Sequence, residues 1–129
     1  MITAPRPPLP RPVVLLVDDE PEIRGVMELG LKEHFEVETA GSASEAEMML
    51  ATRNYDVVVC DHLMPHEEGL PFLTRARRQF PQVQRILITG YINPELLSRS
   101  TSMAGLAGCF MKPVSTAELV QAIRLAVPK

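Results

Sequence analysis

Residues 13–31 read VVLLVDDEPEIRGVMELGL, an apolar run followed by acids and then by a segment of helical period. The first five residues, VVLLV, are continuous in apolar side chains, which is typical of a strand covered on both faces. After the acids, Ile23, Met27 and Leu31 keep the three-to-four spacing of a helix. The pattern therefore predicts a strand followed directly by a helix over 21–33.

Four more strands and four more helices are expected after this first unit. The strands are FEVETA at 35–40, DVVVC at 56–60, RILIT at 85–89 and GCFM at 108–111. The helices follow N-cap signals at Ser42, Asn93–Pro94 and Ser115, with another over 70–80. FEVETA alternates apolar and charged residues, which is typical of an exposed edge strand, whereas the other runs are nearly continuous and predict buried strands.

The strict alternation of strands and helices predicts an α/β fold with helices on both faces of a parallel sheet. Right-handed crossovers leave few ways to wind five such units, and an open, doubly wound (βα)5 sheet is the common one at 129 residues. A closed barrel of eight units would need about twice this chain. Because ligands bind at the carboxyl ends of the strands in open sheets, the residues that follow the strands are the candidates for a site.

The composition is that of one globular domain, with 46% apolar and 22% charged residues. The net charge of -3 argues against direct nucleic-acid binding, and no apolar run approaches the ~18 residues of a membrane span. Cys60 and Cys109 lie in apolar runs, which indicates two reduced, buried thiols and a cytoplasmic location. Prolines crowd residues 1–12, so this segment is expected to be a disordered tail before a domain over 13–129.

Polar residues with complementary chemistry follow four of the expected strands. Asp18 and Asp19 follow the first strand, Asp61 the third, Thr89 ends the fourth and Lys112 follows the fifth. Three converging carboxylates repel one another unless a hard divalent cation lies among them, and Mg²⁺ suits such a set. A lysine and a threonine opposite the acids would receive an incoming anion. Together these groups indicate phosphoryl transfer to an aspartate.

Each of these residues also has an ordinary structural explanation. The aspartate pair could cap a helix, Asp61 could belong to a turn, Lys112 could be solvated, and a threonine followed by glycine is a common strand exit. These explanations together require four coincidences at one edge of the sheet. The combined pattern therefore favours a single site.

The same residues stand in four motifs, LLVDDEPEIR, VVVCDHLMPHEEGL, ILITGY and CFMKPV, in that order along the chain. In these motifs and their spacing, over about 13–127, the chain resembles the response-regulator receiver domain, the CheY-like module of two-component signalling. The resemblance implies a flavodoxin-like sheet with strand order 2-1-3-4-5.

The resemblance implies a role for each acid. Asp61 would be the phospho-acceptor, attacking a phosphohistidine on a histidine kinase or a histidine phosphotransfer protein. Asp19 would bind Mg²⁺, or Mn²⁺ in its place, directly, and Asp18 would act largely through water. The backbone carbonyl of Leu63 would complete the protein's share of the metal ligands.

The resemblance also assigns the residues around the phosphoryl group. Lys112 would contact its oxygens, and Thr89 would move its hydroxyl onto them after transfer. Ile23, Arg24 and Met27 would lie where receivers of this family dock the helical bundle of the kinase.

The switch positions depart from the family pattern. A tyrosine or phenylalanine is usual three residues before the lysine, but that position holds Cys109, and alternation along the strand points the next residue, Phe110, to the opposite face. We expect Tyr91, which follows Gly90, to supply the missing aromatic bulk. Pro113 matches the position where the family often has a cis peptide bond.

The output could take more than one form. The chain ends at AVPK, directly after the last helix, which favours a stand-alone receiver. Its phosphorylation would then control a partner protein, or a dimer, through the face built by the fourth helix, the fifth strand and the fifth helix. The alternative is a receiver cut from a longer regulator with a DNA-binding, ATPase or cyclic-di-nucleotide phosphodiesterase output domain.

Two enzyme-like or cofactor-binding alternatives fit less well. A small Mg²⁺-dependent phosphatase with Asp61 as nucleophile would need a second acid two residues later, where Leu63 stands. Flavin binding would need a phosphate loop where the chain has DDE. We therefore expect a phospho-acceptor rather than an enzyme. A basic group on the expected third helix, Arg75, Arg77 and Arg78, is expected to be solvated.

Overall fold

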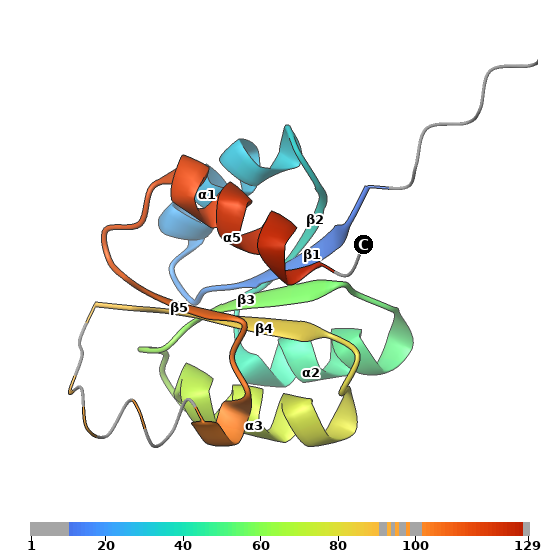
Figure 1. Ribbon diagram of the computed structural model, residues 1–129, viewed down its shortest axis with the longest axis vertical. Coiled ribbons are helices and arrows are strands. Elements are labelled where there is room, and N and C mark those ends of the chain that lie inside the picture. Colours follow the sequence, from blue (N-terminus) through green and yellow to red (C-terminus); the bar gives the residue numbers. More distant parts are fainter. Residues whose placement is uncertain (1–10, 91–92, 94, 96–97, 99–101, 128–129) are drawn as a thin grey trace, which may run out of the picture.

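Strands and helices alternate along the chain, as the sequence predicts (Figure 1). The computed structural model describes residues 11–90, 93, 95, 98 and 102–127. The strands are β1 Val13–Val17, β2 Glu36–Ala40, β3 Val57–Asp61, β4 Gln84–Thr89 and β5 Gly108–Met111. The helices are α1 Pro21–Lys32, α2 Ala43–Thr52, α3 Gly69–Gln79 and α5 Thr116–Ala126.

The segment between β4 and β5 is described in part. Glu95, Ser98 and residues 102–104 are helical, in the place where the sequence predicts a fourth helix. The start of this helix was expected at Asn93–Pro94, and Pro94 lies outside the described residues. Residues 1–10 of the expected N-terminal tail also lie outside them.

The five strands form one parallel sheet in the order β2-β1-β3-β4-β5. This confirms the predicted fold class and strand order. The alternating strand β2 lies at one edge, as its pattern predicts, and the continuous apolar strands β1, β3 and β4 lie inside the sheet. The expectation of a buried strand at 108–111 is wrong, because β5 lies at the other edge and its residues are half-buried or exposed. Inner strands are buried on both faces, which is why their sequences are apolar at nearly every position.

Four strand boundaries differ from the prediction by one residue: the starts of β2, β3 and β4 and the end of β3. Phe35 is not part of β2, because its amide donates a hydrogen bond to the carbonyl of Leu31 (2.9 Å) and still belongs to the exit from α1. Strand β3 continues to Asp61, which pairs with Ile88 of β4. The third aspartate of the candidate site is therefore held by the sheet itself rather than by a loop.

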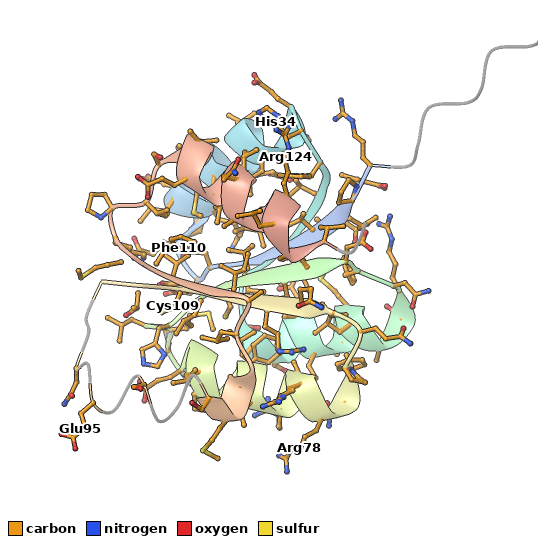
Figure 2. The ribbon with its side chains drawn as sticks, in the orientation of Figure 1. His34, Arg78, Glu95, Cys109, Phe110 and Arg124 are labelled. Atoms are coloured by element: carbon orange, nitrogen blue, oxygen red, sulfur yellow. The ribbon has the colours of Figure 1, made fainter. Side chains whose placement is uncertain are left out.

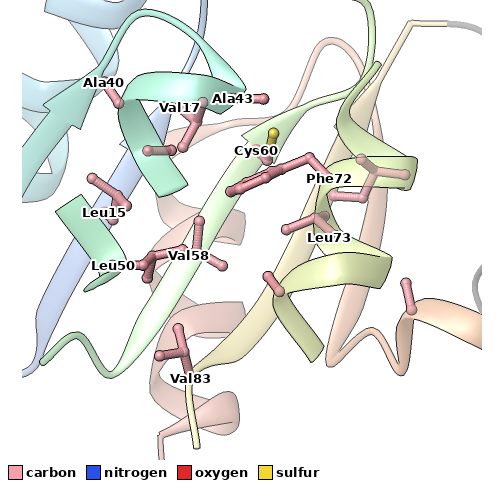
Figure 3. Close-up of a cluster of buried hydrophobic side chains, with 14 of the residues drawn as sticks. Leu15, Val17, Ala40, Ala43, Leu50, Val58, Cys60, Phe72, Leu73 and Val83 are labelled. Atoms are coloured by element: carbon pink, nitrogen blue, oxygen red, sulfur yellow. The ribbon is translucent and has the colours of Figure 1, made fainter. Parts of the chain in front are cut away.

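The sheet separates two apolar cores. Helices α2 and α3 cover one face and α1 and α5 the other (Figure 1). Successive residues of β1 alternate between them: Leu15 and Val17 face the α2–α3 side, whereas Val14 and Leu16 face the α1–α5 side. Figure 3 shows the core on the α2–α3 side, where the fully buried Phe72 of α3 packs among residues of the central strands. These cores hold the strand ends in place.

Two of the predicted N-cap residues, Ser42 and Ser115, begin their helices with a side-chain hydrogen bond. The hydroxyl of Ser42 accepts a hydrogen bond from the amide of Glu45 (3.1 Å) at the start of α2. The hydroxyl of Ser115 accepts one from the amide of Glu118 (3.1 Å) at the start of α5. These bonds satisfy amides that a helix leaves without an internal partner, so each helix begins at a defined residue.

Strand β5 sends successive side chains to opposite faces. Cys109 packs against the core of the α2–α3 side and Phe110 against that of the α1–α5 side, as alternation predicts (Figure 2). The Lys112–Pro113 peptide bond is cis, as the resemblance implied.

Two expectations from composition can be compared with the structure. Cys60 and Cys109 are both free thiols, and Cys60 is buried. Cys109, however, is only half-buried, because β5 lies at the edge of the sheet. Within the described ranges, no helix combines the length and the apolar character needed to cross a bilayer.

Candidate functional site

The three aspartates meet at the carboxyl edge of the sheet. Asp18 and Asp19 follow β1, and Asp61 ends the neighbouring strand β3. Each offers a carboxylate oxygen, and these oxygens all lie within 4.8 Å of one another. The register explains this proximity, because Val17 is paired with Cys60, so the residues that follow them, Asp18 and Asp61, lie at the same level of the sheet.

This acidic cluster (Asp18, Asp19 and Asp61) has the properties of a cation site. Asp18 and Asp61 are only 2% and 4% exposed. One carboxylate oxygen of Asp19 and one of Asp61 are buried without a hydrogen-bond donor among the described residues. Buried polar atoms normally have partners, and carboxylate oxygens without donors are what Mg²⁺ takes as ligands. The donor set therefore fits a divalent cation.

Burial disfavours the charged form of Asp18. It raises the pKa of this carboxyl above its ordinary value, and the negative charges of Asp61 and Asp19 add to the rise. Two groups lower the pKa of Asp18. The Glu20 amide donates a 2.9 Å hydrogen bond to Oδ1 of Asp18, and the Lys112 ammonium adds a nearby positive charge. A bound cation would offset the cost of keeping the cluster ionised.

The other two predicted groups lie at the same edge. Thr89, at the end of β4, is fully buried. The backbone amide of Lys112 donates to the carbonyl of Thr89 (2.8 Å), which ties the ends of β4 and β5 together. The Nζ of Lys112 lies 3.1 Å from Oδ1 of Asp61, an ion-pair distance, although the two atoms are not aligned as a hydrogen bond. A positive charge therefore faces Asp61 directly.

The loop after Asp61 is closed by backbone contacts. The amide of His62 donates to the carbonyl of Ile88 (2.8 Å), and the amide of Gly69 donates to the carbonyl of His62 (2.8 Å). A Cβ atom at Gly69 would lie 2.4 Å from the carbonyl oxygen of Asp61, so only glycine fits. Leu63 is 55% exposed beside the site.

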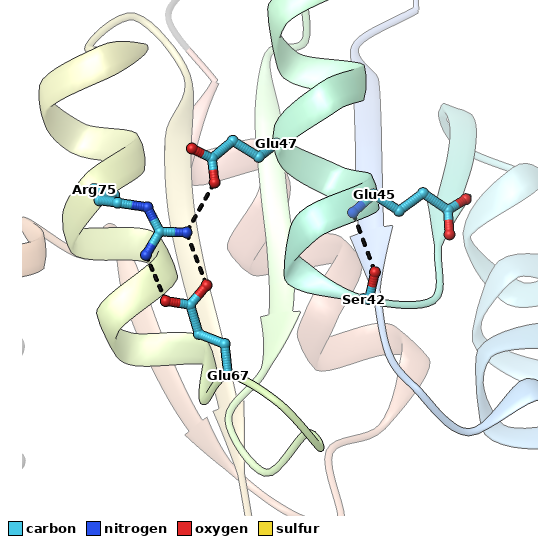
Figure 4. Close-up of polar contacts among 5 residues, drawn as sticks. All are labelled: Ser42, Glu45, Glu47, Glu67 and Arg75. Atoms are coloured by element: carbon cyan, nitrogen blue, oxygen red, sulfur yellow. Dashed lines mark hydrogen bonds and ion pairs between the residues drawn. The ribbon is translucent and has the colours of Figure 1, made fainter.

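A second contact set, which sequence reasoning missed, holds this loop to two helices. Arg75 of α3 donates to both carboxylate oxygens of Glu67 in the loop and, at 2.8 Å, to Glu47 of α2 (Figure 4). Its expected solvation is therefore wrong. Arg77 and Arg78 are exposed, as expected, although Arg77 also donates to the backbone carbonyls at positions 102 and 103. No local pattern marks the partners of Arg75, because Glu67 lies in the loop before the helix and Glu47 lies on another helix.

The Arg75–Glu67 pair makes stability depend on pH. The hydrogen bond from Arg75, and secondarily its charge, hold the pKa of Glu67 below its ordinary value. A lowered pKa in the folded state means that the contribution to stability is present above the ordinary value of 4.5 and is lost as the pH falls through the lowered value.

We expect Glu67→Gln to lower the free energy of unfolding at pH 7 by about 1 kcal/mol, since the pair is partly exposed and screened. The difference from wild type should shrink between pH 7 and an acid pH below the lowered pKa of Glu67, where this carboxyl is protonated in both the folded and the unfolded state. Urea unfolding at the two pH values measures it, with the exposed Glu33→Gln as control. A difference that is the same at both pH values would contradict the assignment.

The residues expected to dock a kinase are placed unevenly on α1. Ile23 is 38% exposed, but Met27 packs against the core and Arg24 turns inward to the carbonyl of Asp18 (2.8 Å). Val26 and Leu29, which the sequence reasoning did not select, are 71% and 70% exposed. Val26 and Leu29 fall outside the stripe of Ile23, Met27 and Leu31 that predicted the helix. Apolar residues outside the core-facing stripe are expected to be exposed, and this pattern could have identified them from the sequence.

Of the positions expected to modulate the switch, Tyr91 lies outside the described residues. Gly90 is exposed, and a Cβ atom there would lie 3.9 Å from the Cδ atom of Lys112. Cys109 and Pro113 lie in β5 and just beyond it, close in sequence to Lys112.

A doubly wound sheet of order 2-1-3-4-5 with an acidic cluster, a threonine and a lysine at its carboxyl edge defines the CheY-like class. The chain belongs to the response regulator receiver domain family, whose model matches residues 14–124.

Similar proteins agree with this assignment. The hydrogenase transcriptional regulatory protein HoxA of Bradyrhizobium diazoefficiens is 35% identical over 114 residues, covering 88% of this chain and 24% of that protein. A CheY-like receiver domain protein from Methanospirillum hungatei is 30% identical with a TM-score of 0.83, over 88% of this chain and 91% of that one.

The response regulator TrrA of Thermotoga maritima, solved in complex with Mg(2+)-BeF, is 29% identical with a TM-score of 0.79, over 90% of this chain and 99% of that one. The chain thus spans whole receiver structures but about a quarter of the length of the HoxA regulator. Members of this family bind Mg²⁺ at an acidic cluster, and this chain has an acidic cluster of Asp18, Asp19 and Asp61 at the carboxyl edge of its sheet.

Proposed function

We propose that the protein is a phospho-accepting signalling module, in which Asp61 receives a phosphoryl group from a phosphohistidine of a histidine kinase or a phosphotransfer protein. The observation that carries this proposal is the pairing of a buried acidic cluster with a lysine ammonium 3.1 Å from one acid. Family membership supports the reaction class. The protein acts as a substrate of its partner, not as an enzyme with turnover.

The residues divide the chemistry among them. A carboxylate oxygen of Asp61 attacks phosphorus, the bond from phosphorus to the histidine nitrogen breaks, and an acyl phosphate forms. A bound Mg²⁺ would neutralise charge on the phosphoryl oxygens. Asp19 would hold the ion directly, Asp18 largely through water, and Leu63 through its backbone carbonyl. Lys112 faces Asp61 and supplies a fixed positive charge, and Thr89 supplies a hydroxyl at the same edge.

Acetyl phosphate provides a test that needs no kinase. We expect the purified protein to gain one phosphoryl group on incubation with acetyl phosphate and Mg²⁺, and none when EDTA replaces Mg²⁺, because the reaction depends on neutralised charge. Intact mass and peptide mapping after reduction of the acyl phosphate would place the group on Asp61. Labelling at another residue, or labelling that ignores Mg²⁺, would contradict the proposal.

The acyl phosphate is expected to be long-lived. Leu63 is 55% exposed beside the site and has no polar group to orient an attacking water. We expect Leu63→Asn to lose its label several-fold faster than wild type in Mg²⁺ buffer, as measured by the decay of the phosphorylated mass. The equally exposed Met111→Gln, outside the loop that follows Asp61, serves as control. Fast decay of the wild-type label would overturn this prediction.

The partners follow from the same assignment. We propose that a helical kinase or phosphotransfer domain docks on α1 through Ile23, Val26 and Leu29, whose apolar side chains are exposed on this helix. Effector control would use the face that the β4–β5 segment, β5 and α5 form. Since HoxA is a transcriptional regulatory protein about four times longer than the match, an output domain, a separate effector or a phosphorylation-dependent dimer could read the signal. We propose a cytoplasmic location.

A further inference from the structure

Arg24 is placed differently from a docking residue. It lies one turn into α1, where its amide donates to the carbonyl of Glu20 (2.9 Å), and its side chain is half-buried. Its Nη1 donates a 2.8 Å hydrogen bond to the backbone carbonyl of Asp18, inside the acidic cluster. The guanidinium is therefore turned toward the candidate metal site and away from the exposed face of α1 that Val26 and Leu29 form.

The Asp18 carbonyl that accepts this hydrogen bond belongs to the peptide unit that joins Asp18 to Asp19. This unit is planar, so the direction of the Asp18 carbonyl also sets the direction in which the chain enters Asp19. Asp19 carries one of the buried carboxylate oxygens without a hydrogen-bond donor. A hydrogen bond to this carbonyl can therefore orient a metal ligand without touching the metal.

Two further bonds fix Asp18 on its other sides. Its amide donates to the carbonyl of Ala40 (3.1 Å), and its Oδ1 accepts from the amide of Glu20 (2.9 Å). Both of these come from the backbone of neighbouring segments. Arg24 thus contributes a third hydrogen bond to Asp18, and this bond comes from a side chain. A substitution can therefore remove it without changing the backbone donors and acceptors.

The loop after β2 leaves space for the guanidinium. A Cβ atom at Gly41 would lie 2.9 Å from Nη1 of Arg24 and 3.8 Å from its Cζ. The arginine head therefore occupies the place that a side chain at position 41 would take. Because the obstructing atoms are the far end of a flexible side chain, alanine at position 41 would displace the guanidinium rather than disrupt the fold.

We propose that Arg24 is a positioning residue of the metal site, which orients the Asp18–Asp19 peptide so that both carboxylates face the cation. The inference rests on the proposed function, because it concerns the Mg²⁺ site of that function. It predicts that Mg²⁺ binds more weakly when the guanidinium is removed by Arg24→Met or displaced by Gly41→Ala.

The sign of the effect separates this role from a simple charge effect. Arg24 carries a positive charge within a Debye length of about 8 Å of the cluster, so its charge alone disfavours a cation. If charge were the dominant effect, Arg24→Met would bind Mg²⁺ more tightly and Gly41→Ala would differ little from wild type. A positioning role predicts weaker binding in both variants, with a loss of about tenfold for Arg24→Met.

Calorimetric titration of the metal-free protein with Mg²⁺ measures the affinity, and urea unfolding in EDTA measures stability separately. Arg78→Met, which removes an exposed arginine at the far end of α3, is the control for loss of one charge (Figure 2). We expect the control to keep wild-type affinity and both test variants to lose it while remaining folded in EDTA.

Unchanged or tighter Mg²⁺ binding by Arg24→Met would overturn the inference, as would a loss of metal-free stability with unchanged affinity of the folded protein. If wild type itself binds no Mg²⁺, the proposed function fails. If wild type binds Mg²⁺ and both variants bind equally well, only the role of Arg24 fails.

Discussion

Asp61→Asn is expected to accept no phosphoryl group and to bind Mg²⁺ at least about tenfold more weakly than wild type. The substitution removes the attacking carboxylate and one anionic ligand from a cluster whose oxygens lie within 4.8 Å. An amide is far less nucleophilic than a carboxylate and carries no charge to offer the cation. Calorimetry with Mg²⁺ and intact mass after acetyl phosphate treatment measure the two losses.

The same variant should be more stable than wild type in EDTA. Asp61 is 4% exposed, and its carboxylate faces two other carboxylates and one ammonium, so removing its charge relieves two repulsions and gives up one attraction. We expect a gain of about 1 kcal/mol, or about 4 °C in the midpoint of thermal unfolding. Glu33→Gln, which removes an exposed charge outside the cluster, should show neither effect. A less stable Asp61→Asn variant in EDTA would contradict this account.

Gly69→Ala is expected to destabilise the fold and to slow phosphorylation together. Its Cβ would lie 2.4 Å from the carbonyl oxygen of Asp61 and 3.0 Å from the Cα of His62, and backbone atoms cannot move aside as a side chain can. Such overpacking costs about 2 to 3 kcal/mol. Because the clash is with Asp61, the proposed acceptor, relief of the strain should displace Asp61 from Lys112.

Gly25→Ala provides a control of opposite sign. Gly25 lies within α1, and no atom outside the helix lies within 4 Å of a Cβ built there. Alanine should therefore stabilise the protein by about 0.5 to 1 kcal/mol through helix propensity. The two variants, Gly69→Ala and Gly25→Ala, are compared by urea unfolding and by their rates of labelling with acetyl phosphate. If Gly69→Ala keeps wild-type stability and labelling, the short distance between position 69 and the Asp61 carbonyl does not require glycine.

The sequence predicted the elements that depend on local patterns. Continuous apolar runs indicated the inner strands, and the alternation in residues 35–40 placed β2 at an edge. The hydrogen bonds at Ser42 and Ser115 confirmed the helix starts. These features could be predicted because burial and capping act over a few neighbouring residues, so their signals lie within a single window of the chain.

Contacts between distant segments could not be predicted in this way. Arg75 was expected to be solvated, but it binds Glu67 and Glu47, the latter from another helix. Arg24 was grouped with docking residues, although its guanidinium reaches back to Asp18. Long cationic side chains can point either to solvent or to a carbonyl several residues away, and the sequence pattern is the same in both cases.

The sequence by itself determined the order of strands and helices and the chemical character of the residues that follow the strands. The tertiary structure decided that Asp18, Asp19 and Asp61 share one buried cluster with the Lys112 ammonium 3.1 Å from Asp61. It also decided which arginines support that edge. The reason is that hydrophobic periodicity is repeated along the chain, whereas the distance between two side chains depends on strand order, register and packing.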